Sequence, residues 1–147
     1  MAQSFTCVYL HIIFSTQQRL PLIAREKQEK LWSYIGGILK NHRMKGIAIG
    51  GMEDHIHVLV SVSSEVSVAK VVNLIKSNSS KWTRVKIPEF GWQKGYAAFS
   101  VSVSAVESVK KYIDTQAEHH KKRDFKQEYL ALLKKHGVEY DPKWVFD

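Results

Sequence analysis

The chain has 147 residues, of which 44% are hydrophobic and 24% charged, which predicts one globular domain over 1–147 and excludes disordered or fibrous classes. No apolar run approaches the ~20 residues of a membrane span, and the N-terminus has no signal-peptide pattern, so neither membrane insertion nor secretion is expected. Lys and Arg outnumber Asp and Glu by 22 to 14, and the net charge of +8 favours a polyanionic partner, nucleic acid above all.

Strand-like runs rich in β-branched and aromatic residues alternate with helical patterns. In chain order, the sequence predicts a strand over Phe5–Phe14, a helix over Ala24–His42, strands over Ile47–Ile49 and His55–Val62, a helix capped by Ser67, and a strand over about Ala97–Val103. Two helices follow, one from a Ser104–Glu107 capping box to about Lys121 and one over about Asp124–His136. The lone Cys7 forms no internal disulfide, which favours a reducing, cytoplasmic location.

The order of these elements, β-α-β-β-α-β followed by two helices, predicts the fold class. It is the order of the ferredoxin-like split βαβ motif, an α+β architecture in which helices pack on one face of an antiparallel sheet. We therefore expect an α+β domain of this kind, extended by two C-terminal helices.

Two histidines begin the third predicted strand. Because side chains alternate along a strand, His55 and His57 share one face, with Cα atoms about 6.6 Å apart, while Ile56 takes the other face. Two imidazoles in this arrangement can converge on one divalent cation. The same pattern also fits two histidines on an exposed strand face, so the pair alone is a weak signal.

Tyr112 and Gln116 lie four residues apart on the helix predicted after Ser104, so they share a helix face. That face is turned about 100° from the apolar stripe of Val106, Val109, Ile113 and Ala117. A phenol outside the stripe is free to react, and an amide oxygen one turn later can bind a metal. Spacing alone favours the simpler interpretation of Tyr112 as a partly buried aromatic on the flank of a helix.

Four segments, taken together, are far more specific than either pair: Phe14–Thr16, Gly51–His57, Trp92–Tyr96 and Tyr112–Gln116. In this order they resemble the single-tyrosine HUH transposases of small bacterial and archaeal insertion sequences, the IS200-like family. "HUH" denotes His, a bulky hydrophobic residue and His, which here are His55, Ile56 and His57. The resemblance covers nearly the whole chain, with no departure at the catalytic positions.

The resemblance implies a role for each of these residues. Tyr112, carried by the C-terminal helices, matches the nucleophile that attacks a backbone phosphate of single-stranded DNA, leaving a 5′-phosphotyrosine and a free 3′-hydroxyl. His55, His57 and Gln116 match the ligands of Mg²⁺ or Mn²⁺, and all three are neutral, so the metal would keep its full charge for the phosphate. Family members act as homodimers that recognise imperfect DNA hairpins near the ends of the element.

The segment between Lys70 and Lys94 carries six basic residues and one acidic residue. We expect it to contact the DNA backbone through Lys70, Lys76, Lys81, Arg84 and Lys86. Trp82 and Trp92 are aromatic candidates for stacking on unpaired bases, although the helical phase of Trp82 favours a position in the core.

Two alternatives stay open at this point. A ferredoxin-like sheet with aromatic residues also describes RNA-recognition domains, and Lys94–Phe99 approximates one of their motifs. A domesticated, non-mobile relative of the transposases would have the same sequence features. Palindromes flanking the gene would indicate a mobile element.

Overall fold

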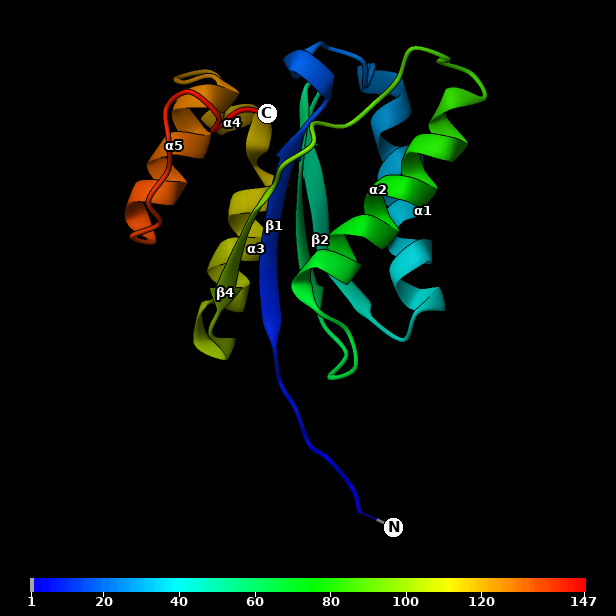
Figure 1. The fold of residues 1–147 in the computed structure, drawn as a ribbon, viewed down its shortest axis with the longest axis vertical. Coiled ribbons are helices and arrows are strands. Elements are labelled where there is room, and N and C mark those ends of the chain that lie inside the picture. The colour runs from blue at the N-terminus through cyan, green and yellow to red at the C-terminus, as the bar shows by residue number, and fades with distance from the viewer. Residues whose placement is uncertain (1) are drawn as a thin grey trace.

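The computed structural model describes residues 2–147, which form one sheet and helices on both of its faces (Figure 1). The strands are β1 (Tyr9–Ser15), β2 (Lys45–Met52), β3 (His55–Ser61) and β4 (Ala97–Val101). The helices are α1 (Arg25–Asn41), α2 (Val68–Arg84), α3 (Val106–Asp114), α4 (Gln116–His119) and α5 (Phe125–Lys135). Short 3-10 turns lie over Gln17–Arg19 and Val103–Ala105.

The four strands pair in the order β2-β3-β1-β4, and every neighbouring pair is antiparallel. In the central pair, Ser15 lies opposite His55 and Ile13 lies opposite His57. Gly51, at the end of β2, has φ 158°, and a Cβ there would lie 2.2 Å from the carbonyl oxygen of His55, so only glycine fits this hairpin. The predicted α+β class and antiparallel sheet are confirmed.

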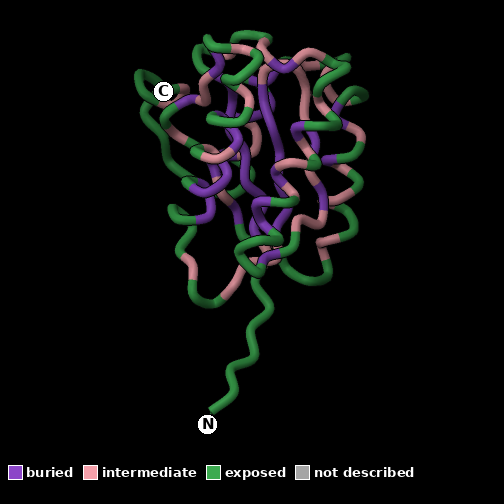
Figure 2. The backbone as a smooth tube through the Cα atoms, turned by 90° about the vertical axis from the view of Figure 1, so that its right-hand side faces the viewer, coloured by how far each residue is buried: buried purple, intermediate pink, exposed green. Residues whose placement is uncertain are grey.

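The two faces of the sheet carry separate apolar clusters, because successive side chains of each strand alternate between them. One face packs against α1 and α2 through Leu10, Ile12, Phe14, Ile56, Val58 and Val60. The other face packs against α3 and α5 through Ile13, Ala97, Phe99, Ala48 and Leu59. Figure 2 shows buried residues concentrated in the middle of the molecule and exposed residues toward its outside.

Helices cover both faces of the sheet, whereas RNA-recognition domains stack bases on an open sheet face. This difference weakens the comparison with RNA-recognition domains. The aromatic residue that ends the Lys94–Phe99 segment, Phe99, is only 4% exposed and stacks on His136 of the segment that follows α5. The ring is therefore not presented to a ligand.

The helix boundaries predicted after β4 are wrong in two respects. The predicted capping box at Ser104 does not form, because Ser104 lies in a 3-10 turn and its hydroxyl pairs with Ser102. The helix that was expected to continue to Lys121 breaks at Thr115, which separates α3 from α4. A capping box does begin α5. The Asp124 side chain accepts from the backbone N–H of Gln127, and the Gln127 side-chain oxygen accepts from the backbone N–H of Asp124.

Within residues 2–147, no helix combines the length and the apolar character that crossing a bilayer requires.

Candidate functional site

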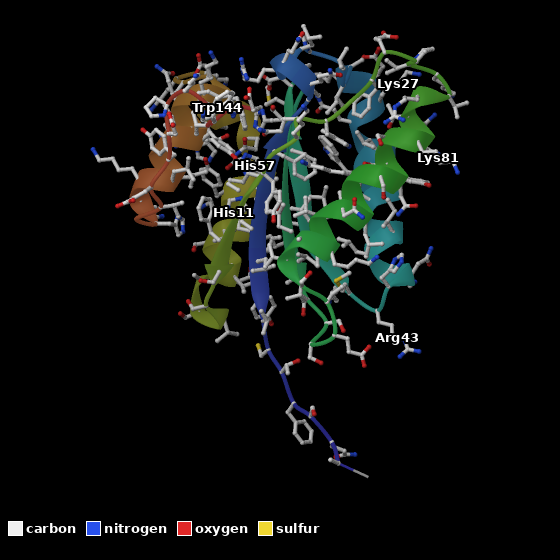
Figure 3. All side chains as sticks on the ribbon, in the orientation of Figure 1. His11, Lys27, Arg43, His57, Lys81 and Trp144 are labelled. Atoms are coloured by element: carbon white, nitrogen blue, oxygen red, sulfur yellow. The ribbon has the colours of Figure 1, made fainter. Side chains whose placement is uncertain are left out.

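The histidine pair of β3 lies on the face covered by α3, α4 and α5, where Figure 3 labels His57 beside His11 of β1. His55 and His57 are both fully buried, and their ring centroids are 5.2 Å apart. The strand alternation predicted for them is confirmed, because Ile56 and Val58 belong to the opposite cluster. The alternative of two histidines on an exposed strand face is excluded, since the C-terminal helices cover this face.

A buried carboxylate from α5, Glu128, completes this cluster. Its Oε1 lies 3.1 Å from Nε2 of His57, 3.4 Å from Nε2 of His55 and 3.2 Å from Nε2 of His120. One ligand atom from each of His55, His57 and Glu128 lies within 4.8 Å of the others, which is close enough to hold one metal ion. The sequence interpretation did not include Glu128.

Gln116 reaches the same point from the start of α4. Its Oε1 lies 3.0 Å from Nε2 of His55 and 3.0 Å from Nε2 of His120. Its amide nitrogen donates to Oε2 of Glu128 at 3.2 Å and to the carbonyl of Tyr112 at 3.4 Å, which fixes the orientation of the amide. The structure thus places Gln116 against His55, one of the two histidines with which the family resemblance groups it.

The outer nitrogens of both histidines have partners that orient the rings. Nδ1 of His55 donates to Oδ1 of Asp54 at 2.7 Å, and Nδ1 of His57 lies 2.9 Å from Nε2 of the buried His11. Partners of this kind set the tautomer of a metal-binding imidazole. They leave the Nε2 atoms of His55 and His57 facing Glu128 and Gln116.

This donor set suits a divalent cation. With Nδ1 of His55 donating to Asp54, its Nε2 carries a lone pair that faces the lone pairs of Gln116 Oε1, so these atoms converge without a proton between them. Two imidazoles, a carboxylate and an amide oxygen match Mn²⁺ and related ions, and oxygen ligands also suit Mg²⁺. The carboxylate departs from the all-neutral ligand set expected from the sequence.

Tyr112 of α3 is half-buried beside this cluster, and its hydroxyl donates a hydrogen bond to Oε2 of Glu128. Burial and the hydrogen bond to Glu128 raise the pKa of the Tyr112 phenol well above its usual value. Burial alone would raise the pKa of Glu128, but hydrogen bonds from His120 and His57 outweigh it and hold that pKa far below its usual range. The carboxylate is therefore charged and the phenol protonated.

An open hollow of about 580 Å³ adjoins Tyr112, between β4, α3 and α5. Arg123, Lys135 and His136 contribute to its lining, together with the buried His11. The hollow gives a ligand access to the phenol, and its cationic lining favours a ligand with negative charge.

Comparisons with known proteins identify the family of this chain. The profile of the family described as "Transposase IS200 like" matches residues 4–116. The chain belongs to the IS200-like transposase family. One similar protein is the ISDra2 transposase TnpA of Deinococcus radiodurans. It is 23% identical to this chain over 114 residues, which cover 72% of this chain and 81% of that protein.

Two solved structures share the fold of this IS200-like chain. A Deinococcus radiodurans R1 protein assigned as a transposase superposes with a TM-score of 0.64 at 18% identity, over 79% of this chain and 95% of the other. A REP-associated tyrosine transposase bound to a REP hairpin superposes with a TM-score of 0.59 at 13% identity, over 82% and 74% of the two chains. At these identities the superpositions establish the common fold.

The basic residues predicted to contact DNA lie on or just after α2, across the sheet from the histidine cluster. Exposed side chains include those of Lys70, Lys81, Arg84 and Lys86. Lys76 is different, because its ammonium donates to the carbonyls of Gln93, Lys94 and Gly95 at 2.8, 3.2 and 2.7 Å. DNA contact by these five residues stays a prediction, and Lys76 has a role within the fold in addition.

The sequence interpretation missed Glu128, although a signal for this residue exists. Phe125, Glu128, Tyr129 and Leu133 are the buried residues of α5, so the carboxylate lies on the apolar face of its helix. An acidic residue at a core-facing position needs a partner, and the histidines provide it. His120, four residues after Gln116, reaches the same carboxylate from the turn that follows α4.

Proposed function

We propose that this transposase cleaves and rejoins single-stranded DNA at hairpin-bearing ends through a covalent bond to Tyr112. The Tyr112 oxygen attacks a backbone phosphorus, the bond from phosphorus to the 3′ oxygen breaks, and the products are a 5′-phosphotyrosine and a free 3′-hydroxyl. The reverse attack by a 3′-hydroxyl rejoins the strand without ATP, because the phosphodiester energy is kept in the tyrosyl bond. The observation that carries the proposal is the position of the Tyr112 hydroxyl, between the open hollow and the histidine cluster.

The ligands for a divalent cation would be His55, His57 and Gln116, with Glu128 as an additional ligand. A bound Mg²⁺ or Mn²⁺ would neutralise charge on the non-bridging phosphate oxygens and orient the phosphate. Asp54 and His11 hold the two imidazoles in place for this purpose.

Glu128 positions the nucleophile. The low pKa of Glu128 and the raised pKa of Tyr112 keep the proton on the phenol, so the hydrogen bond orients the hydroxyl without ionising it. Phosphate entering the hollow meets the cations Arg123 and Lys135, which would hold the backbone on either side of the attacked bond.

A hairpin partner is supported by the REP-associated tyrosine transposase, which was solved bound to a REP hairpin. The homodimer and the cytoplasmic location expected from the sequence stay predictions. Whether the element is mobile or domesticated is decided by the DNA around the gene, because mobility requires palindromic ends on both sides.

The test uses single strands that carry the palindromes flanking the gene, labelled at either end and incubated with Mn²⁺. A 3′-labelled strand should appear on a denaturing gel as a protein–DNA adduct, and a 5′-labelled strand as a shorter free fragment. Chelation with EDTA should abolish both products. Cleavage without an adduct, or an adduct that forms equally well in EDTA, would contradict the proposal.

A further inference from the structure

A second, more apolar cavity lies on the opposite face of the sheet, between the start of α1 and the end of α2. Its volume is about 250 Å³, and it is open on one side. Leu22, Ile23, Leu31, Val85 and Ile87 supply apolar walls. This volume is just below the roughly 300–1,000 Å³ of pockets for drug-sized ligands, so the cavity fits one small group and not an extended ligand.

Trp82 lines this cavity and is 40% exposed, which corrects the core position favoured by its helical phase. Its indole stacks on the ring of Tyr34, with centroids 4.4 Å apart and an angle of 11° between the planes. Tyr34 holds the indole by one face and leaves the rest of the ring available to a flat ligand. The other aromatic candidate, Trp92, packs instead between Phe14 and Phe90 and is no platform.

The rim of the cavity is cationic. Three exposed lysines, Lys27, Lys30 and Lys86, belong to its lining, and none of the lining residues in the described part of the chain is acidic. Figure 3 labels Lys27 on α1 and Lys81 on α2, the two helices that form the walls. An apolar floor with an aromatic platform and a cationic rim matches a nucleobase with its phosphates.

The cavity lies at the same end of the sheet as the histidine pair. The amide of its wall residue Ile23 donates to the carbonyl of Glu53 at 2.9 Å, and Glu53 lies two residues before His55. In Figure 1 the start of α1 and the end of α2 reach the same end of the strands as α4. One DNA strand bound beside the histidine pair can therefore extend around this end of the sheet to the cavity.

We infer that this cavity binds one unpaired base of a single-stranded DNA segment that extends from the segment cleaved at Tyr112. The base stacks on the indole of Trp82, and Lys27, Lys30 and Lys86 contact the neighbouring phosphates. This inference rests on the proposed function, because it takes single-stranded DNA as the ligand. Its consequence is a second point of attachment that fixes where the strand lies relative to the nucleophile.

The test is fluorescence anisotropy with a labelled DNA hairpin that carries single-stranded extensions on both sides. Trp82→Leu keeps an apolar side chain but removes the aromatic face, and it should weaken binding about 5- to 150-fold, the range of one lost base–aromatic stack. Trp82→Phe should retain most of the affinity. Trp144→Leu is the matched control, because Trp144 is 59% exposed, lies outside the cavity and should leave the affinity unchanged.

Extensions made of abasic nucleotides distinguish stacking from other losses. They should weaken the wild type to the affinity of Trp82→Leu and have little further effect on that variant. Equal affinities of wild type and Trp82→Leu for the intact DNA would overturn the inference. A Trp82→Leu variant that changes its oligomeric state in sedimentation but keeps its DNA affinity would also overturn the inference. The cavity would then bind a second copy of the chain instead of DNA.

The same DNA separates this inference from the proposed function. A wild type that neither binds the DNA nor forms the adduct contradicts the proposed function itself. A wild type that binds and forms the adduct, while Trp82→Leu binds equally well, contradicts the cavity inference alone. Thermal unfolding of each variant verifies that the protein used is folded.

Discussion

The hydroxyl of Tyr112 donates a hydrogen bond to one oxygen of Glu128, whose other oxygen faces His57. A single buried carboxylate therefore connects the candidate nucleophile to the candidate metal ligands. The connection joins α3 and α5 to β3, which lies much earlier in the chain. It places the reactive phenol next to the position where a cation would bind a phosphate.

Glu128→Gln should weaken Mn²⁺ binding by about 10- to 100-fold or more, because losing even a partner outside the ligand set has effects of this size. The amide keeps the shape of the side chain but lacks the charge that faces His57 and His120. Calorimetric titration of the metal-free protein measures the change.

The matched control for that titration is Glu118→Gln, because Glu118 is exposed and forms a surface ion pair with Lys121. Circular dichroism shows whether each variant is folded before metal is added. An Mn²⁺ affinity of Glu128→Gln equal to that of the wild type would exclude Glu128 as a ligand.

His11→Gln should make stability less dependent on pH under acidic conditions. Burial and the neighbouring His57 lower the pKa of His11 to about 3, so below about pH 6.5 the unfolded chain takes up a proton that the folded chain does not. The free energy of unfolding therefore falls as the pH is lowered. Removing this group should reduce the slope by up to about 1.4 kcal/mol per pH unit.

Urea unfolding in EDTA between about pH 6.5 and 4.5 measures this slope. The glutamine amide can still donate to Nδ1 of His57, so the comparison isolates the lost titration. Parallel curves for the wild type and His11→Gln would show that His11 is protonated in the folded state.

The site was predictable from the sequence wherever a short local pattern determines the geometry. The alternation of β3 places His55 and His57 together, and Ser67 caps α2 by accepting from the Lys70 amide, as expected. The spacing of Tyr112 and Gln116 also brings both to one place, although the helix between them is broken.

Glu128 was not predictable in the same way, because its partner His57 lies 71 residues away. Contacts of that range depend on how α5 packs across the sheet, which no local pattern states. The Ser104 capping box failed for a similar reason. The chain turns too tightly after β4, and Ser102 takes the hydroxyl that the helix would have used.

Lys76→Ala should lower the free energy of unfolding by roughly 1.5–3 kcal/mol, the usual contribution of a hydrogen bond to a charged group. Its ammonium donates to three carbonyls of the segment that precedes β4 and also lies 4.9 Å from the centroid of the Phe14 ring. The exposed Lys81→Ala is the control and should stay within about 0.5 kcal/mol of the wild type. Denaturant unfolding that gives equal stabilities would show that Lys76 does not hold this segment.

Combining Lys70→Ala with Lys81→Ala should reduce the salt dependence of DNA binding. If both lysines contact phosphates, the slope of log K against log salt should fall by about 1.5. The loss should be similar for matched and mismatched hairpins, because phosphate contacts carry no sequence information. Anisotropy at several salt concentrations measures the slope, and an unchanged slope would move the backbone contacts to the Tyr112 hollow.

The most direct test of the central claim is mass spectrometry of the proteolysed covalent adduct, which identifies the residue that carries the DNA. The nucleotide should be found on the peptide that contains Tyr112, and Tyr112→Phe should yield no adduct while still binding the hairpin. Tyr96 and Tyr129 are the alternative nucleophiles to be examined. Tyr96 is exposed, and burial raises the pKa of Tyr129 to about 12. A nucleotide on either of these residues, or an adduct that survives in Tyr112→Phe, would contradict the account.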